Sequence, residues 1–213
     1  MTGTYAHLNH MTDYLGLEAL LSEEERMVRA TARDFVNREV LPVIEQHAQA
    51  QTFPSGLVVK MGELGFFGAT LPERYGCAGL SHRAYGLLLY ELERGDSGLR
   101  SFASVQGSLV MWPIFTYGSE AQKEKWLPLL AAGAKIGCFG LTEPDFGSNP
   151  GGMLTRAERV GPGRWRLNGT KMWITNGTVA DVAVVWARTS EGIRGFLVEK
   201  GTPGFSAPEM HGK

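Results

Sequence analysis

The spacing of apolar residues changes near residue 134, from a helical period before it to the alternation of β-strands after it. The first part has polar helix starts followed by apolar residues three or four positions apart. The second part has short runs rich in Val, Ile, Phe and Trp between turns that contain Gly. A segment with one period cannot bury its apolar face in the other structure. The sequence therefore predicts an α+β protein, with an all-α helical domain over 1–134 and an antiparallel β-barrel or sandwich domain over 135–213.

The helices of the first part are predicted from their starting and ending residues. Ser22 and Glu25 form a capping box that opens the first helix, which Pro42 should kink or end. A short helix over 55–64 should end at Gly65. Further helices are expected to begin at polar capping residues, at Ser81, at Asp96-Ser97-Gly98 and at Ser119.

Six strands are predicted in the second part, over 136–142, 155–160, 164–168, 170–175, 182–187 and 195–199. The extended apolar piece Gly204–Pro208 has the pattern of one more strand. We therefore expect the sheet to be incomplete at Lys213, with an edge that is not paired.

The charge pattern argues against several classes of partner. The 21 Lys and Arg residues and 22 Asp and Glu residues are scattered along the 213-residue chain, and the formal net charge is −1. No basic run suggests binding to nucleic acid or to a membrane surface. No stretch of about 18 apolar residues could span a bilayer, and no targeting segment is visible. The default prediction is a cytoplasmic protein.

The Cys and His residues do not suggest a reactive or metal site. Two thiols, Cys77 and Cys138, are too few for a disulfide framework, which favours a reducing compartment. Cys138 lies in an apolar strand, where a small buried hydrophobic residue is the expected interpretation. No metal site is expected, because metal-ligand spacing is absent among the histidines at His7, His10, His47, His82 and His211.

Two segments of the second part could together line a planar ring. Phe139–Ser148 places the Thr142 hydroxyl at a strand end, where it could bond the polar edge of a heteroaromatic group. Lys171–Gly177 is predicted to present Trp173 and Thr175 on one face of a strand. Taken as residue types alone, these are also compatible with a core Trp and two threonines that favour strands.

At these residues the chain resembles the acyl-CoA dehydrogenase family of flavoproteins. The joint match consists of Leu141-Thr142-Glu143-Pro144, Gly147-Ser148 and Trp173-Ile174-Thr175-Asn176-Gly177. The glutaryl-CoA dehydrogenase branch is the most similar. The residues that carry this finer match are Tyr75–Gly79, Glu91–Arg94, Asp96–Gly98 with Arg100-Ser101, and Arg194–Phe196.

The resemblance implies that FAD binds at the two segments. It places flavin contacts at Phe139, Leu141, Thr142, Trp173, Ile174 and Thr175. Ser148, in a Gly-flanked loop, is expected to contribute both to the cofactor site and to binding of the pantetheine arm or thioester of coenzyme A. Asn149 stands where family members usually have Asp, which keeps a hydrogen-bonding side chain but removes its charge.

A substrate site is expected at the start of the helix that follows Asp96. If Ser97 is the N-cap, Arg100 is the third helical residue, where the helix dipole disfavours a cation and an anionic ligand would compensate. Ser101 and Ser104 add two hydroxyls. The resemblance implies that Arg100 holds the distal carboxylate of the substrate and that Glu93 orients Arg100. An exposed surface pair is the alternative.

The resemblance implies an activity for the complete protein. This is α,β-oxidation and decarboxylation of glutaryl-CoA to crotonyl-CoA, with electrons passed to an electron-transfer flavoprotein by a homotetramer. No Glu in this chain matches the family's catalytic base, which is expected beyond Lys213, so this chain alone is expected to be inactive. Two alternatives stay open, a short-chain acyl-CoA dehydrogenase for a neutral acyl group and a non-catalytic flavin- or coenzyme A-binding truncated homologue.

Overall fold

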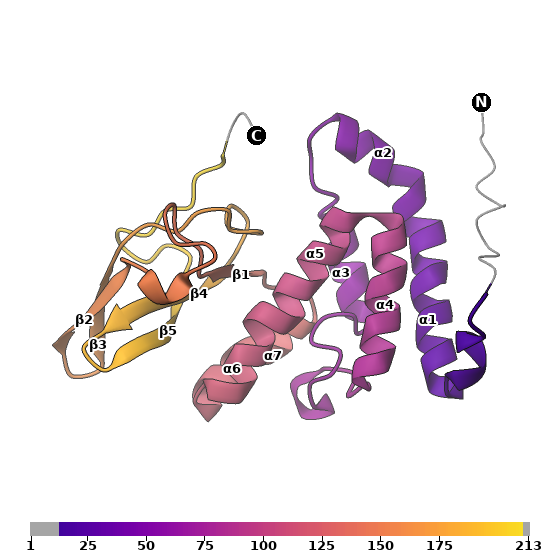
Figure 1. Ribbon diagram of the computed structural model, residues 1–213, viewed down its shortest axis with the longest axis horizontal. Coiled ribbons are helices and arrows are strands. Elements are labelled where there is room, and N and C mark those ends of the chain that lie inside the picture. Colours follow the sequence, from indigo (N-terminus) through magenta and orange to yellow (C-terminus); the bar gives the residue numbers. More distant parts are fainter. Residues whose placement is uncertain (1–12, 211–213) are drawn as a thin grey trace.

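The computed structural model describes residues 13–210. Helices form the first part of the described chain and strands the second, as predicted (Figure 1). The α-helices are α1 (Glu23–Phe35), α2 (Leu41–Gln49), α3 (Gly56–Glu63), α4 (His82–Gly95), α5 (Ser97–Ser104), α6 (Trp112–Tyr117) and α7 (Glu120–Ala131). Two π-helical segments, η3 (Val36–Val40) and η5 (Val105–Met111), join neighbouring α-helices, and the short 3-10 turns are η2 (Leu17–Leu20), η4 (Glu73–Tyr75) and η6 (Pro150–Gly152).

Several helix starts have the predicted caps. The Ser22 hydroxyl accepts a hydrogen bond from the Glu25 amide at 3.2 Å, and the Glu25 carboxylate accepts one from the Ser22 amide at 2.9 Å. Ser119 and Gln122 form the same reciprocal pair at α7, and Ser81 caps α4. Pro42 lies in the first turn of α2, which follows the π-helical segment η3 directly, and the helix does not end there. The helical path therefore passes from α1 through η3 into α2.

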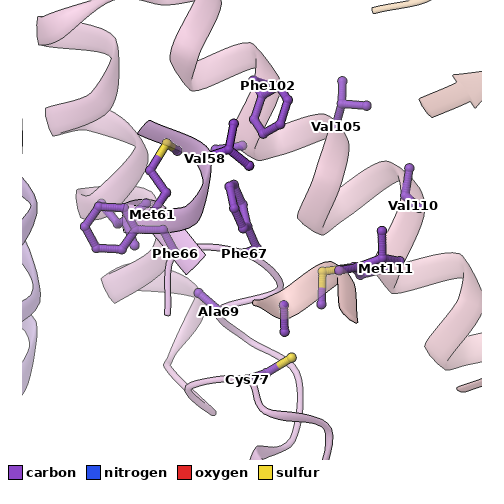
Figure 2. Packing of buried hydrophobic residues seen from close by; sticks show 14 of the residues in the cluster. Val58, Met61, Phe66, Phe67, Ala69, Cys77, Phe102, Val105, Val110 and Met111 are labelled. Carbon is purple, nitrogen blue, oxygen red and sulfur yellow. The ribbon is translucent and has the colours of Figure 1, made fainter. Parts of the chain in front are cut away.

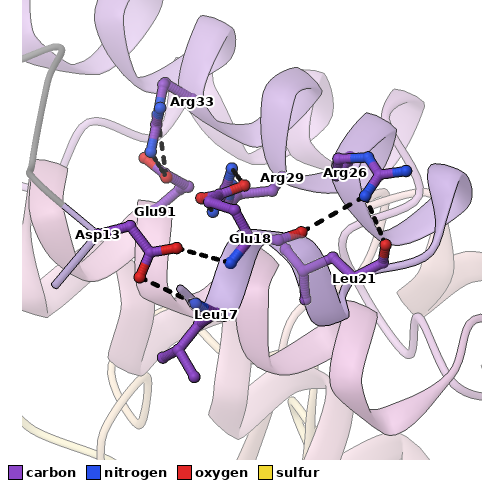
Figure 3. Close-up of polar contacts among 8 residues, drawn as sticks. All are labelled: Asp13, Leu17, Glu18, Leu21, Arg26, Arg29, Arg33 and Glu91. Atoms are coloured by element: carbon purple, nitrogen blue, oxygen red, sulfur yellow. Dashed lines mark hydrogen bonds and ion pairs between the residues drawn. The ribbon is translucent and has the colours of Figure 1, made fainter. Parts of the chain in front are cut away.

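An ion pair between Glu18 and Arg29 joins the N-terminal segment to α1, and further ion pairs join α1 to α4 (Figure 3). The Asp13 carboxylate accepts hydrogen bonds from the amides of Leu17 and Glu18 at 2.9 and 2.7 Å. Arg33 of α1 contacts the fully buried carboxylate of Glu91 at 2.7 Å, and Arg94 contacts it at 2.9 Å. A buried carboxylate needs such partners, because one left unpaired is strongly destabilising. This network fixes the end of α4, from which Glu93 projects.

One hydrophobic core includes both the helices and the sheet. Figure 2 shows Phe67 and Phe102 in this cluster, with Val58 and Met61 of α3 on one side and Met111 of η5 on the other. The same cluster contains Val182 and Val184 of the sheet. The helices and the sheet therefore pack as one body, and η5 lies against the first strand.

The five strands form a mixed sheet, which corrects the prediction of a purely antiparallel one. They are β1 (Gly137–Gly140), β2 (Arg156–Gly161), β3 (Arg164–Asn168), β4 (Val182–Thr189) and β5 (Gly192–Glu199). The pairs β2–β3 and β4–β5 are antiparallel hairpins, but β1 and β2 both run parallel to β4. Only a short hairpin loop forces antiparallel pairing, and β1 and β2 reach β4 through long connections.

Two predicted strands are absent from the described residues. The segment 170–175 is irregular and leads into a turn, and Trp173 has a φ of 60° that no strand residue adopts. The main cause is tertiary, because the Met172 amide donates to the Thr142 carbonyl rather than to a ladder. Gly204 belongs to a turn and residues 205–208 have no regular structure, so no strand forms there. The expectation of an unfinished sheet at Lys213 concerns a residue outside the described ones.

Candidate functional site

Two segments far apart in sequence lie side by side at the end of β1. The Met172 amide donates to the Thr142 carbonyl at 2.9 Å, and the Asn176 side-chain amide donates to the Gly137 carbonyl at 3.2 Å. Asn176 has a φ of 66°, a left-handed conformation that Asn tolerates better than most residues. The Met172 bond joins Phe139–Ser148 to Lys171–Gly177, the pair of segments that the sequence singled out, and the Asn176 bond attaches the second segment to the first residue of β1.

A buried ion pair links the same two segments. The Lys171 ammonium contacts the Glu143 carboxylate at 2.8 Å and the Leu141 carbonyl at 3.0 Å. Glu143 also accepts hydrogen bonds from the Leu154 and Thr155 amides at 2.6 and 3.0 Å. Burial alone would raise the pKa of the Glu143 carboxyl, but Lys171 and these amides outweigh it and hold the pKa at about 2. The Glu143 carboxylate is therefore ionised and a poor proton acceptor at neutral pH.

The predicted contact residues differ in what they expose. The Phe139 ring packs edge to face on Trp186 with centroids 6.0 Å apart, so it belongs largely to the core. Ile174 packs against the small buried cluster that contains Cys138 and Val185. Among the described residues, no hydrogen bond occupies the hydroxyl groups of three polar candidates, Thr142, Ser148 and Thr175.

Trp173 and Thr175 are not related as the sequence predicted. They lie in an irregular segment and a turn, so strand alternation does not place them on one face. The Trp173 side chain is nevertheless 57% exposed, a large apolar surface for an indole beside the Thr142 loop. An exposed indole on the segment that is bonded to the Thr142 loop fits a planar heteroaromatic ligand that has one apolar face and one polar edge.

The predicted arginine site lies on the α4–α5 hairpin. The Arg100 Nε donates to Glu93 Oε2 at 2.5 Å, and the Ser97 hydroxyl donates to Glu93 Oε1 at 2.6 Å. The hydrogen bond from Ser97 is the first cause that lowers the pKa of the Glu93 carboxyl, followed by the one from Arg100. The Ser104 hydroxyl donates to the Ser101 carbonyl at 3.0 Å, so it is partly used by the helix itself.

The predicted tract Asp96–Gly98 caps α5, but the condition on which the dipole argument depended, Ser97 as the N-cap, is not met. Asp96, not Ser97, is the N-cap, since its carboxylate accepts from the Leu99 amide at 2.6 Å. The Arg100 amide consequently already bonds the Asp96 carbonyl, at 3.1 Å, as a fourth helical residue. The Arg100 cation lies farther from the positive helix end than assumed, which weakens the dipole argument. The pairing with Glu93 now explains its position.

Sequence reasoning missed two polar residues that hold these elements together, Lys171 and Gln106. Lys171 lay inside a predicted strand, and nothing local indicated its partner Glu143. Gln106 is fully buried in the core between η5 and β1. A polar residue flanked by apolar ones in a helical pattern was the available signal for it.

Metal and membrane features are absent from residues 13–210. No group of three or more Cys, His, Asp or Glu side chains is placed to hold a metal ion there. His47 bonds the Thr52 hydroxyl at 2.8 Å, and His82 packs against Trp112. His7, His10 and His211 lie outside the described residues. In the same range, no helix has both the length and the apolar character needed to cross a membrane.

Comparison with known proteins places the chain in a family. The model of the acyl-CoA dehydrogenase N-terminal domain matches residues 22–134, and that of the acyl-CoA dehydrogenase middle domain matches residues 138–213. The crystal structure of a glutaryl-CoA dehydrogenase from Mycobacterium smegmatis in complex with FADH2 is 59% identical, with a TM-score of 0.89. That match covers 91% of this chain and 50% of the other.

Two further relatives have different names. Butyryl-CoA dehydrogenase from Megasphaera elsdenii is 36% identical with a TM-score of 0.81, over 87% of this chain and 51% of the other. The short-chain specific acyl-CoA dehydrogenase, mitochondrial, of Rattus norvegicus is 41% identical over 198 residues, covering 91% of this chain and 48% of that protein. The chain thus spans about half the length of these relatives. It belongs to the acyl-CoA dehydrogenase family.

Proposed function

We propose that the full-length protein is an FAD-dependent acyl-CoA dehydrogenase that acts on glutaryl-CoA. The observation that carries this choice of substrate is the orientation of Arg100. Glu93 engages its Nε, and among the described residues no hydrogen bond uses the two terminal nitrogens of the guanidinium. A cation held at one edge with its other edge available suits a ligand carboxylate, which can accept two parallel N–H bonds.

The surroundings of Arg100 support the same proposal. Its side chain is 35% exposed, so a ligand can reach it while much of its stem is packed. Both oxygens of Glu93 are bonded, one by Arg100 and one by Ser97, which limits the directions in which the guanidinium can point. Ser101 and Ser104 would flank the bound carboxylate. We assign to this cluster the distal carboxylate that distinguishes glutaryl-CoA from a neutral acyl-CoA.

The cofactor proposal rests on the two segments at the end of β1. When bound, FAD supplies the acceptor for the hydride that leaves the acyl chain. In this assignment the Thr142 and Thr175 hydroxyls hold the polar edge of the ring, and Trp173 covers an apolar face. Phe139, Leu141 and Ile174 shape the surface beneath, and Ser148 contributes at the side of the pantetheine arm.

The catalytic base is assigned to residues outside this sequence. The two segments contain two carboxylates, Glu143 and Asp145. Glu143 has a pKa of about 2, which makes it unsuited to remove a proton from the carbon next to a thioester. We therefore propose that the 213-residue chain alone does not catalyse the reaction.

The wider role of the protein follows from the same proposal. Oxidation would be accompanied by loss of the distal carboxylate as CO2, giving crotonyl-CoA, and the electrons would pass to an electron-transfer flavoprotein. A homotetramer and a cytoplasmic location are likewise proposed, although the rat relative is named as a mitochondrial protein.

A second candidate is a dehydrogenase for a neutral short acyl group. The similarity to the short-chain enzyme from rat and to butyryl-CoA dehydrogenase favours it. A neutral acyl group has no carboxylate, however, and so it would leave Glu93 as the anionic partner of Arg100. A flavin- or coenzyme A-binding protein without activity is the third possibility.

A substrate comparison separates these candidates. The full-length protein, purified with FAD, is mixed anaerobically with glutaryl-CoA or with butyryl-CoA, and bleaching of the flavin absorbance is followed. The proposal requires kcat/KM for glutaryl-CoA to exceed that for butyryl-CoA by at least about tenfold. Preference for butyryl-CoA would establish the second candidate. Bound FAD with no reduction by either thioester would support the third.

A further inference from the structure

Gln106 connects three parts of the backbone that meet between the helices and the sheet. It is fully buried on η5, and its amide nitrogen donates to the Leu130 carbonyl at 3.0 Å and to the Lys135 carbonyl at 2.8 Å. Its amide oxygen accepts from the Gly137 amide at 2.8 Å. Both ends of this side chain are therefore satisfied, one at the end of α7 and the linker and the other at the first residue of β1.

Gly137 also packs closely against η5. A Cβ atom at this position would lie 2.4 Å from a methyl carbon of Val110, so β1 lies directly against η5 with no room for a side chain. The Gly137 carbonyl accepts the hydrogen bond from the Asn176 side chain at 3.2 Å. Gly137 thus bonds Gln106 through its N–H and Asn176 through its C=O.

This chain of contacts joins the two halves of the proposed site. Gln106 follows α5, which carries Arg100, in the same helical run. Gly137 begins the strand that leads to Thr142, and Asn176 belongs to the segment that contains Trp173 and Thr175. A shift of η5 along β1 would therefore move the arginine relative to both segments.

We infer that Gln106 is a positioning residue that sets the distance between the arginine cluster and the two segments assigned to FAD, an inference that rests on the proposed function. Its role in the reaction is indirect, through Gly137 and Asn176. Hydride transfer depends steeply on the separation of donor and acceptor, so a displacement of about 1 Å can cost about a hundredfold in rate.

The test uses two variants of the full-length flavoprotein. Gln106→Met keeps the length of the side chain and deletes all three hydrogen bonds. Asn176→Gly deletes only the bond to Gly137 and suits the positive φ at this position, so it should fold even if Gln106→Met does not. The control is Phe35→Ala, a buried residue of α1 that packs on Phe66 away from β1. All variants are compared at a temperature where each is fully folded.

We expect a slower chemical step and a changed environment of the bound flavin, with little effect on substrate binding. Both variants should lower the rate of flavin reduction at saturating glutaryl-CoA by about tenfold or more and change the visible circular dichroism of bound FAD. The dissociation constant for the substrate should change less than about threefold. Phe35→Ala should lower Tm without either change. A parent-like rate and spectrum in both variants, or the same losses in Phe35→Ala, would overturn the inference.

Amide hydrogen exchange tests the same inference without relying on enzyme activity. In Gln106→Met the Gly137 amide and the segment 173–177 should exchange faster than in the parent at equal global stability, whereas Phe35→Ala should show no such local change. If the parent binds FAD but no acyl-CoA reduces it, the proposed function fails. The exchange rates and the flavin spectrum then decide the inference about Gln106 by themselves, and unchanged values in both would refute it.

Discussion

The Nε atom of Arg100 lies 2.5 Å from Oε2 of Glu93, across the turn between α4 and α5. The two residues are seven positions apart, which would not bring them together on one continuous helix, but the hairpin places them opposite each other. Ser97 bonds the second oxygen of Glu93 at 2.6 Å. The pair is partly exposed, so its value for stability is small and its geometry matters more.

Replacing Arg100 with Ala in the full-length protein should selectively damage turnover of glutaryl-CoA. Loss of a charge-assisted pair in a partly desolvated site should cost about 2 to 4 kcal/mol in transition-state binding, or roughly 30- to 1000-fold in kcat/KM. Butyryl-CoA should be affected less than about threefold. Steady-state kinetics with both thioesters measure this. Arg166→Ala, which removes an exposed pair with Glu158, is the control. Equal losses with the two substrates would exclude a carboxylate-binding role.

Replacing Thr175 with Val should separate cofactor binding from cofactor reduction. Val keeps the β-branched shape but lacks the hydroxyl donor, so the full-length protein should retain FAD while its reduction rate falls or its flavin potential shifts. Thr178→Val, in the same turn, is the matched control and should leave both unchanged. Anaerobic stopped-flow measurements and a redox titration report the two quantities. A parent-like rate and potential in Thr175→Val would remove Thr175 from the proposed contacts.

Glu143 should make the stability of the chain depend on pH in acid. Its pKa in the folded protein is about 2, against 4.5 as the ordinary value, so the unfolded chain binds the proton more tightly. The ionised Glu143 therefore contributes fully to the free energy of unfolding above about pH 4.5, and this contribution is lost as the pH falls toward 2. The stability advantage of the parent over Glu143→Gln should shrink by about 1 kcal/mol for each pH unit below 4.5.

Urea unfolding between pH 6 and about pH 3.5 checks this prediction for Glu143. Glu158→Gln, at an exposed ion pair, should show a much weaker dependence. The Lys171 side chain is only 11% exposed, so Glu143→Gln should also be strongly destabilised at neutral pH by the unpaired ammonium. Adding Lys171→Met should recover part of that loss. A pH-independent difference from the parent would contradict the ionised, bonded state of Glu143.

Cys77 and Cys138 should be unreactive in the folded chain. Burial raises the pKa of each thiol to about 11, so very little thiolate exists at pH 8, and the side chains are shielded as well. A thiol-specific disulfide reagent at pH 8 should label neither residue rapidly until urea is added, after which both should react. Cys138→Ser identifies which thiol responds. Rapid labelling of one equivalent in the native protein would show that a cysteine is accessible.

Local sequence determined the helix boundaries that depend on near neighbours. The capping boxes at Ser22 and Ser119 and the cap at Ser81 join residues three positions apart, so their partners are visible in the sequence. The cap of α5 was predicted only as a tract, because Asp96 and Ser97 are adjacent residues that can both cap. Several predicted strands were also found, since β4 and its hairpin partner carry long β-favouring runs.

The residues of the candidate site were predicted from the family motifs, which do not show what holds these residues in place. Strand propensity predicted a strand over 170–175. The segment is instead irregular, because the Met172 amide bonds Thr142 and a turn follows Trp173. The ion pair of Lys171 with Glu143 spans 28 positions, and the Gln106 bond to Gly137 spans 31. No local pattern encodes such partners, because each forms only when separate elements pack.

The sequence by itself determined the change from helices to strands, the helix caps at Ser22, Ser81 and Ser119, and the family motifs, because these depend on residue type and on contacts within a turn. Tertiary structure alone decided the parallel pairing of β1 and β2 with β4, the irregular path at Trp173 and the contacts of Gln106. These choices depend on which distant groups can satisfy buried donors and acceptors. Burial makes an unpaired polar group costly, so packing between elements overrides local preference wherever the two disagree.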